Sequence, residues 1–384
     1  MATDLSPTAT GASRATPART TAPLKLVGSR SGRIGVALFV VLVIAVPVNT
    51  TSTYWLGILN TAGIAAIAAI GLNVLTGYAG QLSLGHAFFV GIGAFTAQWV
   101  GGAHGLPMIV WLPVAGIVAG VAGAAVAPFA LRLRGPYLMI VSLALVFIGI
   151  YIARNLTSIT GGNEGTIVEA RATLGPIDFE SLTVGSLVFA REQGLFVLIW
   201  ALVGLAVLLV ANVMRTRGGR AMQAVRDHDM AAEVLGVRMM RTQTNAFVLS
   251  AVLAGVAGGL LAVNLQYVRP DSFDVDLSVQ YLAIIVIGGL ASLWGPVLGA
   301  IFVTLVPVVV DQFAHSLPFM SSGGGSGLST TDLSLILYGA LIVVFLLTEP
   351  KGLVSTFSRL RRALRPSTGS AGRPPRTTHR EDDA

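Results

Sequence analysis

The polar residues best suited to bind a small solute lie in a glycine-rich stretch, residues 77–85, between two apolar runs. This stretch carries Tyr78, Gln81 and Ser83, whose side chains donate and accept hydrogen bonds. Polar, irregular backbone between apolar segments is tolerated where it is buried or lines a cavity. Ser83 is also placed to act as the N-cap of a helix that continues through Phe95. We therefore predict a polar break in the chain that lines a solute path.

Three more polar residues extend this candidate path. Ser278 begins another apolar run, which ends at residues 288–289, and the free N–H groups of two such helices would favour a carboxylate. His86 follows the break, and a lone histidine near a helix start is more often a packing residue or a carbonyl donor than a ligand. Asn73 is expected to hydrogen-bond a neighbouring helix, with path lining as the alternative.

The most informative polar segment is residues 215–245, in which residues 219–236 are predicted to form one or two short amphipathic helices. Apolar contact is predicted for Ala221, Met222, Val225, Ala232 and Leu235. Gly236 is expected to end or bend the second helix. The segment either lies on anionic lipid at the inner leaflet or docks on a protein partner, and its interleaved acids favour the partner. Those acids are Asp227, Asp229 and Glu233.

Motifs for covalent and nucleotide chemistry are absent from the sequence. There is no G-x-x-x-x-G-K-[ST] loop for ATP, no H-E-x-x-H cluster for a metal, and no cysteine. We therefore expect a chain that is not an enzyme and that binds no metal or cofactor itself.

The composition requires a membrane environment. The 384 residues are 54% hydrophobic and 11% charged, and the mean hydropathy is +0.77, whereas soluble domains carry about 25% charged residues. The net charge of +7 flanks apolar runs, which argues against nucleic acid as a partner.

Ten apolar runs predict a polytopic protein with about ten transmembrane helices. They lie at 34–48, 56–76, 84–100, 108–130, 136–153, 195–214, 246–266, 277–290, 295–312 and 333–348. Several approach the roughly 20 residues that cross a bilayer, and the shorter ones are candidates for tilted, broken or re-entrant segments. None has Asp, Glu, Lys or Arg in its interior, so an intramembrane proton relay is not indicated. Either the energy comes from elsewhere or the path is passive.

The loop charges predict that both termini are cytoplasmic. Arginines gather in residues 131–135, in 215–245 and after 350, whereas acids dominate 154–194 and 267–276, as the positive-inside rule requires. The predicted parts are a disordered cytoplasmic tail at 1–32, a membrane domain at 33–355 and a basic, disordered cytoplasmic tail at 356–384. The membrane domain includes an external loop, 154–194, and a cytoplasmic loop, 215–245.

The segment GLNVLTGYAGQLSLGHAFFVGIGAF at 71–95 closely resembles the signature of LivM-type permeases, which are subunits of branched-chain amino acid ABC importers. Further matches follow in the expected order at 131–137, 219–236, 246–255 and 288–299. The resemblance covers roughly residues 34–355. One departure is TGGNEG at 160–165, where the family often has a Gly-Gly-Pro-Asn-Gly pattern.

This resemblance implies an all-α permease with an inverted repeat of five spans each, located in the plasma membrane. It implies a second permease, two cytoplasmic ATPase subunits, an external solute-binding protein and membrane lipid as partners. The Ala-Ala-x-x-x-Gly pattern resembles the loop by which such permeases dock on their ATPases, although Met230 stands where that loop has Glu. The implied coupling residues are Arg226, Asp227, Ala231, Ala232, Glu233 and Gly236.

The implied substrates are branched-chain amino acids or similar small solutes such as urea and short amides. Two alternatives stay open, a passive channel and an ion-coupled carrier. The channel would not need the Ala-Ala-x-x-x-Gly loop, and the carrier would need a titratable site, for which His86 is the candidate near a span.

Overall fold

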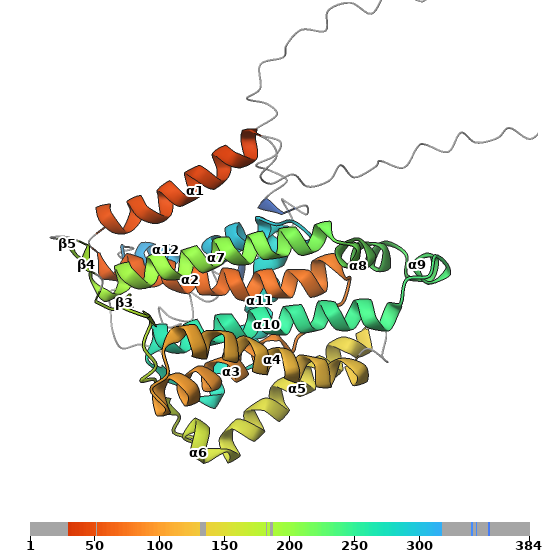
Figure 1. Ribbon diagram of the computed structural model, residues 1–384, viewed down its shortest axis with the longest axis horizontal. Helices are drawn as coiled ribbons and strands as arrows, with labels where there is room; N and C mark the ends of the chain where they lie inside the picture. Colours follow the sequence, from red (N-terminus) through yellow and green to blue (C-terminus); the bar gives the residue numbers. More distant parts are fainter. Residues whose placement is uncertain are drawn as a thin grey trace, which may run out of the picture.

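The computed structural model of the chain describes residues 30–50, 52–130, 136–181, 183–184, 187–316, 339–340, 343 and 352–353. Within these residues the fold is mostly helical (Figure 1). The main helices are α1 (Arg30–Asn49), α2 (Thr53–Leu72), α3 (His86–Ala97), α4 (Met108–Ala130), α5 (Pro136–Asn155), α7 (Arg191–Arg215), α10 (Met239–Leu265), α11 (Val275–Gly288) and α12 (Gly295–Ser316). Shorter helices are η1 (Asn73–Tyr78), η2 (Gln98–Ala103), α6 (Thr157–Thr160), α8 (Arg217–Asp227), α9 (Asp229–Val234) and η3 (Pro270–Phe273).

Every predicted apolar run from 34–48 to 295–312 coincides with a helix. The run at 333–348 lies almost wholly outside the described residues, as do residues 131–135, 1–29 and 356–384. The helix α1 begins at Arg30, so it overlaps the last residues of the tail predicted at 1–32, and the predicted domain boundaries stay predictions.

Five of the described helices are long and apolar enough to cross a bilayer: Thr53–Tyr78, Met108–Phe129, Tyr137–Asn155, Arg191–Arg215 and Met239–Leu265. The helices α3 and α11 are shorter, as their apolar runs indicated. The architecture is therefore that of a polytopic membrane protein, and the count of ten spans stays a prediction.

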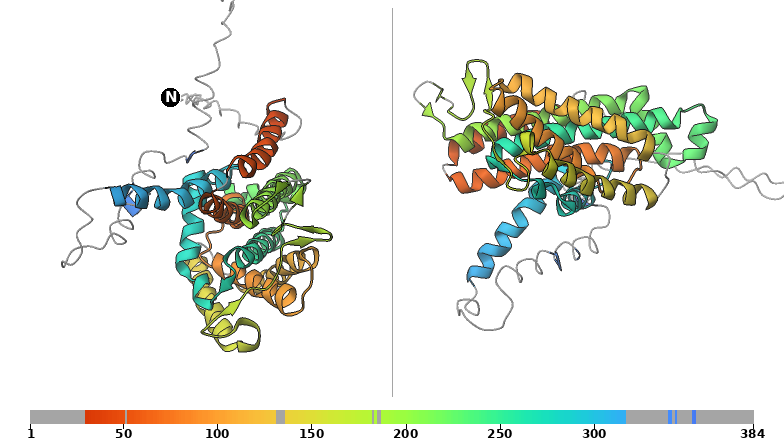
Figure 2. Two further views of the ribbon diagram at one scale, coloured as in Figure 1. Left: turned by 90° about the vertical axis from the view of Figure 1, so that its left-hand side faces the viewer. Right: turned by 90° about the horizontal axis from the view of Figure 1, so that it is seen from below.

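Small residues let α10 pack closely against α4, next to its contacts with α2 and α3. A Cβ atom on Gly120 of α4 would lie 2.6 Å from the Val252 side chain, and one on Gly255 of α10 would lie 2.5 Å from Ala119. Both glycines belong to G-x-x-x-G patterns, which allow helix backbones to approach in lipid. Figure 2 shows α12 projecting away from this packed centre, although its first half contacts α2 and α11.

The two long polar loops lie at opposite ends of the bundle (Figure 1). We call the end that carries α8 and α9 the α8 end, and the end that carries the loop at 154–194 the strand end. The fold is mostly helical, as predicted, and the described residues also include six strands of two residues each. These are β1 (Thr166–Ile167), β2 (Thr173–Leu174), β3 (Ile177–Asp178), β4 (Thr183–Val184), β5 (Leu187–Val188) and β6 (Tyr267–Val268).

The strands form three antiparallel pairs, β1 with β6, β2 with β3, and β4 with β5. The pair of β1 with β6 fastens the loop at 154–194 to the segment before η3. Two further bonds fasten this loop to the helices, because the Trp111 indole donates to the Arg171 carbonyl oxygen at 3.2 Å and the Glu169 N–H donates to Gln98 Oε1 at 2.9 Å. The loop therefore packs as a cap on the strand end.

Candidate functional site

The predicted polar break is present between α2 and α3. The α2 helix widens into the π-helical turn η1, the chain is irregular from residue 79 to 85, and α3 begins at His86. Single π-helical turns are often found at functional sites. All six residues predicted to line the solute path are buried: Asn73, Tyr78, Gln81, Ser83, His86 and Ser278.

The prediction that Ser83 is the N-cap of α3 is wrong. The N-cap position is Gly85, and the Ser83 hydroxyl, two residues earlier, accepts a hydrogen bond from the Gly85 N–H at 3.3 Å rather than from the first turn of the helix. The Ser278 hydroxyl of α11 instead accepts from the Ala87 N–H at 3.0 Å. A free N–H group of the first turn is thus satisfied by a neighbouring helix rather than by the preceding residue.

Ser278 does not begin α11 either. The helix starts at Val275, and its N-cap is Asp274, whose carboxylate accepts from the Leu277 N–H at 3.2 Å. Aspartate is among the preferred N-cap residues, so Ser278 is left in the second turn with its side chain directed at α3.

His86 joins α3 to two other helices. Its Nε2 atom lies 2.8 Å from the Ala68 carbonyl oxygen of α2, so this nitrogen carries the proton and donates. Its ring meets the Tyr281 ring of α11 edge to face, with centroids 5.7 Å apart. These contacts fit a packing residue that donates to a carbonyl.

Asn73 binds a turn rather than a helix. Its Nδ2 donates to the Ser292 carbonyl oxygen at 2.8 Å, and its Oδ1 accepts from the Ala291 N–H at 2.9 Å. Ala291 has φ +56°, a left-handed conformation that is uncommon without glycine. The two hydrogen bonds hold this strained turn between α11 and α12, so Asn73 links the two interruptions of the helical chain.

Two buried polar atoms of the break have no hydrogen-bond partner among the described residues, the Tyr78 hydroxyl and Gln81 Oε1. Buried polar atoms without partners are rare and disfavoured. Between them lies Gly80, with φ +72°, where a Cβ atom would stand 3.2 Å from Arg226 Cγ and 3.3 Å from Arg226 Cα. The break is therefore in direct contact with α8.

The segment predicted to couple the chain to a partner forms the two expected helices, α8 and α9. Met222, Val225 and Ala232 are buried, whereas Leu235 is exposed, so the apolar contact predicted for Leu235 is not made within this chain. Gly236 ends α9 with φ +84°, and the N–H groups of residues 236 and 237 donate to the carbonyl oxygens of residues 233 and 232. These two hydrogen bonds together form a Schellman motif, which ends the helix at Gly236 as the sequence indicated.

The outward side of α9 carries exposed apolar side chains beside charged ones. Met230, Val234 and Leu235 are exposed, together with Ala231 and Glu233. On α8, Arg226 and Asp227 are exposed at the last turn. Large apolar side chains exposed together at one end of the molecule are typical of an interaction surface. The six predicted coupling residues thus lie on one short helical pair, with Ala232 as its buried member.

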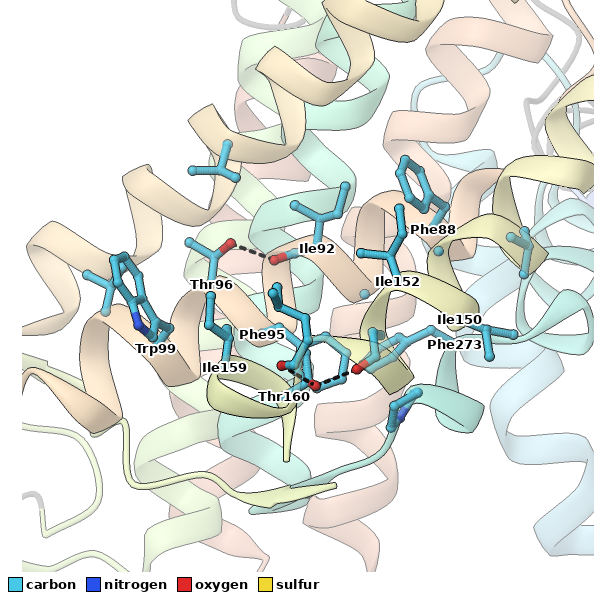
Figure 3. A pocket seen from close by; sticks show the side chains of 18 of the residues that line it. Phe88, Ile92, Phe95, Thr96, Trp99, Ile150, Ile152, Ile159, Thr160 and Phe273 are labelled. Carbon is cyan, nitrogen blue, oxygen red and sulfur yellow. Dashed lines mark hydrogen bonds between the residues drawn. The ribbon is translucent and has the colours of Figure 1, made fainter. Parts of the chain in front are cut away.

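A cavity of about 400 Å³ lies between α3, α4 and α5 and was not predicted. Figure 3 shows Phe88, Ile92 and Phe95 of α3 facing Ile152 of α5 and Phe273 of η3 across it. The spacing of Phe88, Ile92 and Phe95 places them on one helical face, which is the signal that the sequence offered.

The sequence matches the model of the family described as the permease component of branched-chain amino acid transport systems, over residues 54–346. A high-affinity branched-chain amino acid transport permease, LivM of Escherichia coli K12, is 31% identical over 308 residues, which cover 75% of this chain and 67% of that protein. LivM of Salmonella typhimurium is 32% identical over 301 residues, with the same coverage.

A more distant relative is LivH of Methanocaldococcus jannaschii, described as a probable branched-chain amino acid transport permease. It is 27% identical over 59% of this chain and 67% of its own length. An autoinducer 2 import permease, LsrC of Klebsiella pneumoniae, is 36% identical over 28% of this chain and 34% of its own length. No solved structure matches the fold. This sequence similarity agrees with the multi-pass helical membrane domain and with the buried polar break beside a short helical pair. The chain belongs to the family of permease components of branched-chain amino acid ABC importers.

Proposed function

We propose that this permease carries branched-chain amino acids, or small solutes like them, across the cell membrane, and that two cytoplasmic ATPase subunits supply the energy. A second permease would complete the path, and an external solute-binding protein would deliver the solute. The two LivM relatives are branched-chain amino acid transport permeases, which supports this solute class. The relative LsrC is an autoinducer 2 import permease, so relatives also import other solutes.

The proposed topology has ten spans, an inverted repeat and both termini in the cytoplasm. The α8 end then faces the cytoplasm and the strand end faces outward, which is supported by the arginines of 215–245 and the acids of 154–194 at opposite ends (Figure 1). The short helices α3 and α11 are the candidate counterparts of the repeat. Residues 1–32 and 356–384 would be cytoplasmic tails.

The contact between α8 and the polar break is the observation that carries the proposed coupling. Arg226 lies against Gly80, and two buried polar atoms nearby have no described partner. A partner that moves α8 would therefore move the break directly, since no flexible segment lies between them. The exposed apolar side chains of α9 supply a docking surface for that partner.

The two alternative functions have less support. Among the described residues, the buried polar side chains include His86 but no Asp, Glu, Lys or Arg, and His86 is engaged with Ala68 and Tyr281. An ion-coupled carrier would need a group free to exchange protons within the membrane. A passive channel would leave the α8–α9 surface without a role.

The coupling is tested with the permease, its partner permease and the ATPases reconstituted in proteoliposomes with the external binding protein. We expect leucine uptake that requires ATP. Arg226→Ala is expected to lower uptake about tenfold while ATP hydrolysis continues, because a 1.4 kcal/mol change in coupling corresponds to a factor of ten. Arg217→Ala, an exposed arginine at the start of the same helix, is the matched control. Full uptake without ATPase subunits would refute the proposal.

The proposed orientation is tested by single cysteines, because the natural sequence has none. A membrane-impermeant maleimide should label Ser181→Cys, in the 154–194 loop, on intact cells. It should label Asp229→Cys, in α9, only after the membrane is opened. Both residues are exposed, so the reverse pattern would place the α8 end outside.

A further inference from the structure

We propose that the cavity between α3, α4 and α5, together with the ion pair at its strand end, is a binding site for one amino acid with a large aliphatic side chain. The side chain would occupy the cavity. The α-carboxylate would bind Arg154 and Arg269, and the α-ammonium group would bind Asp271. The inference rests on the proposed function and assigns a place in this chain where its solute is recognised.

The cavity suits an apolar part of a ligand, such as an aliphatic side chain. Its volume of about 400 Å³ lies in the usual range for small-molecule sites, roughly 300–1,000 Å³. The described residues that line it include no charged side chain. Its hydroxyl groups are engaged, since Thr96 donates to the Ile92 carbonyl oxygen and Thr160 donates to the Leu156 carbonyl oxygen. A polar ligand group placed here would lose hydrogen bonds with water and find few partners, such as the Trp99 indole N–H.

Charges of both signs adjoin, along the chain, residues that line this apolar space. The Arg154 guanidinium at the end of α5 lies 2.6 Å from one Asp271 carboxylate oxygen, and the Arg269 guanidinium lies 3.8 Å from the other. The neighbours of these residues along the chain line the cavity, on α5 and α6 as well as on η3. These lining neighbours are Ala153, Leu156, Pro270 and Phe273.

The ion pair can give way to a ligand. The side chains of Arg154 and Asp271 are 48% and 42% exposed, and such half-exposed pairs contribute little to stability because water and salt screen them. An amino acid brings one carboxylate and one ammonium group, so it replaces each partner of the pair with a group of the same charge. Free urea or a short amide has no aliphatic group to fill the cavity and no carboxylate for Arg154.

The test measures binding of radiolabelled L-leucine to the complex of permeases and ATPases in nanodiscs, without ATP and without the external binding protein. Ala153→Leu places three more carbon atoms in the cavity and should weaken binding at least tenfold. Ala144→Leu makes the same change on the exposed side of α5 and should leave binding unchanged.

Charge variants give a pattern that a folding defect would not reproduce. Arg154→Gln should weaken binding of L-leucine about tenfold but leave L-leucinamide, which lacks the carboxylate, unaffected. Asp271→Asn should weaken binding of L-leucinamide but leave 4-methylpentanoate, which lacks the ammonium group, unaffected. Equal affinities in all variants would overturn the assignment.

Two other outcomes would also overturn it. If Ala153→Leu displaced a co-purifying lipid without changing leucine affinity, the cavity would hold an acyl chain. If it changed only the association of the two permeases, the cavity would belong to their interface. ATP-driven leucine uptake that persists with an unchanged KM in these variants would refute this site alone, whereas absence of ATP-driven amino acid uptake in the unaltered complex would refute the proposed function.

Discussion

At its first turn α3 is fixed by hydrogen bonds to three other helices, whereas one of its faces, from Phe88 to the last turns, borders a cavity. The Ser278 hydroxyl of α11 caps the first turn, His86 donates to α2, and the Ser142 hydroxyl of α5 accepts from the backbone just before the helix. At the other end, Thr96 bonds only to a carbonyl of its own helix and Phe95 faces the cavity. The same helix is thus anchored by hydrogen bonds at its first turn and also lines a cavity of ligand size.

The largest expected effect compares two phenylalanines of α3. Phe89 meets Phe247 edge to face with ring centroids 5.6 Å apart, and Phe95 meets Phe273 at the same distance. Phe89→Ala should lower the free energy of unfolding by about 3–5 kcal/mol. The loss for Phe95→Ala should be smaller than that for Phe89→Ala by at least about 1 kcal/mol, because a side chain beside a cavity has fewer contacts to lose. Thermal unfolding in detergent measures both, and equal losses would remove the contrast between the two ends.

The next prediction concerns Asn73, in the polar break between α2 and α3. Asn73→Leu removes two hydrogen bonds to the turn between α11 and α12 and should cost about 2–4 kcal/mol, since the turn's buried groups lose their partners. Asn60→Leu is the matched control, because Asn60 is also fully buried but donates only to the Glu192 carbonyl oxygen. Thermal unfolding that is lowered as much by Asn60→Leu would contradict a special role for Asn73.

A smaller effect tests the cap across helices. Ser278→Ala leaves the buried Ala87 N–H without its acceptor and should cost about 1–2 kcal/mol. Thr96→Val removes a hydroxyl that bonds to its own helix and should change stability by less than about 0.5 kcal/mol. Both are read from the midpoint of thermal unfolding. A larger loss for Thr96→Val would mean that the cavity end, not the first turn, is the fixed point.

The smallest effect is expected for His86→Gln. The glutamine amide keeps a donor for the Ala68 carbonyl oxygen, so the loss should be about 1 kcal/mol or less. Leucine uptake should remain dependent on ATP and insensitive to a proton ionophore. The contrary outcome is uptake that is abolished by the ionophore in the natural protein but no longer responds to it in His86→Gln. It would identify His86 as a proton carrier and would mean that its first-turn contacts are mobile.

Local features were predictable from the sequence. The apolar runs predicted the helices because a backbone in lipid must satisfy its own hydrogen bonds, which a helix does within one segment. The glycines gave the break at residues 77–85 and the end of α9 at Gly236, whose φ of +84° is a conformation that glycine adopts without strain. The burial of Met222 and Val225 followed from their spacing on α8.

Features that join distant segments were not predictable. The cap of α3 comes from Ser278, 191 residues away, and no local pattern distinguishes it from Ser83. Leu235 was expected to contact apolar surface, but α9 ends at Val234 and Leu235 is exposed in the chain on its own. The cavity depends on how loosely α5 packs against α4, a property of the assembled bundle.

The central position of α10 also constrains how the chain matures on the ribosome. The helices α2, α3 and α4 all pack on α10, yet α4 ends at Ala130 and α10 begins only at Met239. At roughly 5–20 residues per second, translation of the intervening chain takes on the order of ten seconds. During that interval the faces of α2, α3 and α4 that pack on α10 lack this partner, so nascent chains arrested before Met239 should be preferred substrates for membrane quality-control proteases.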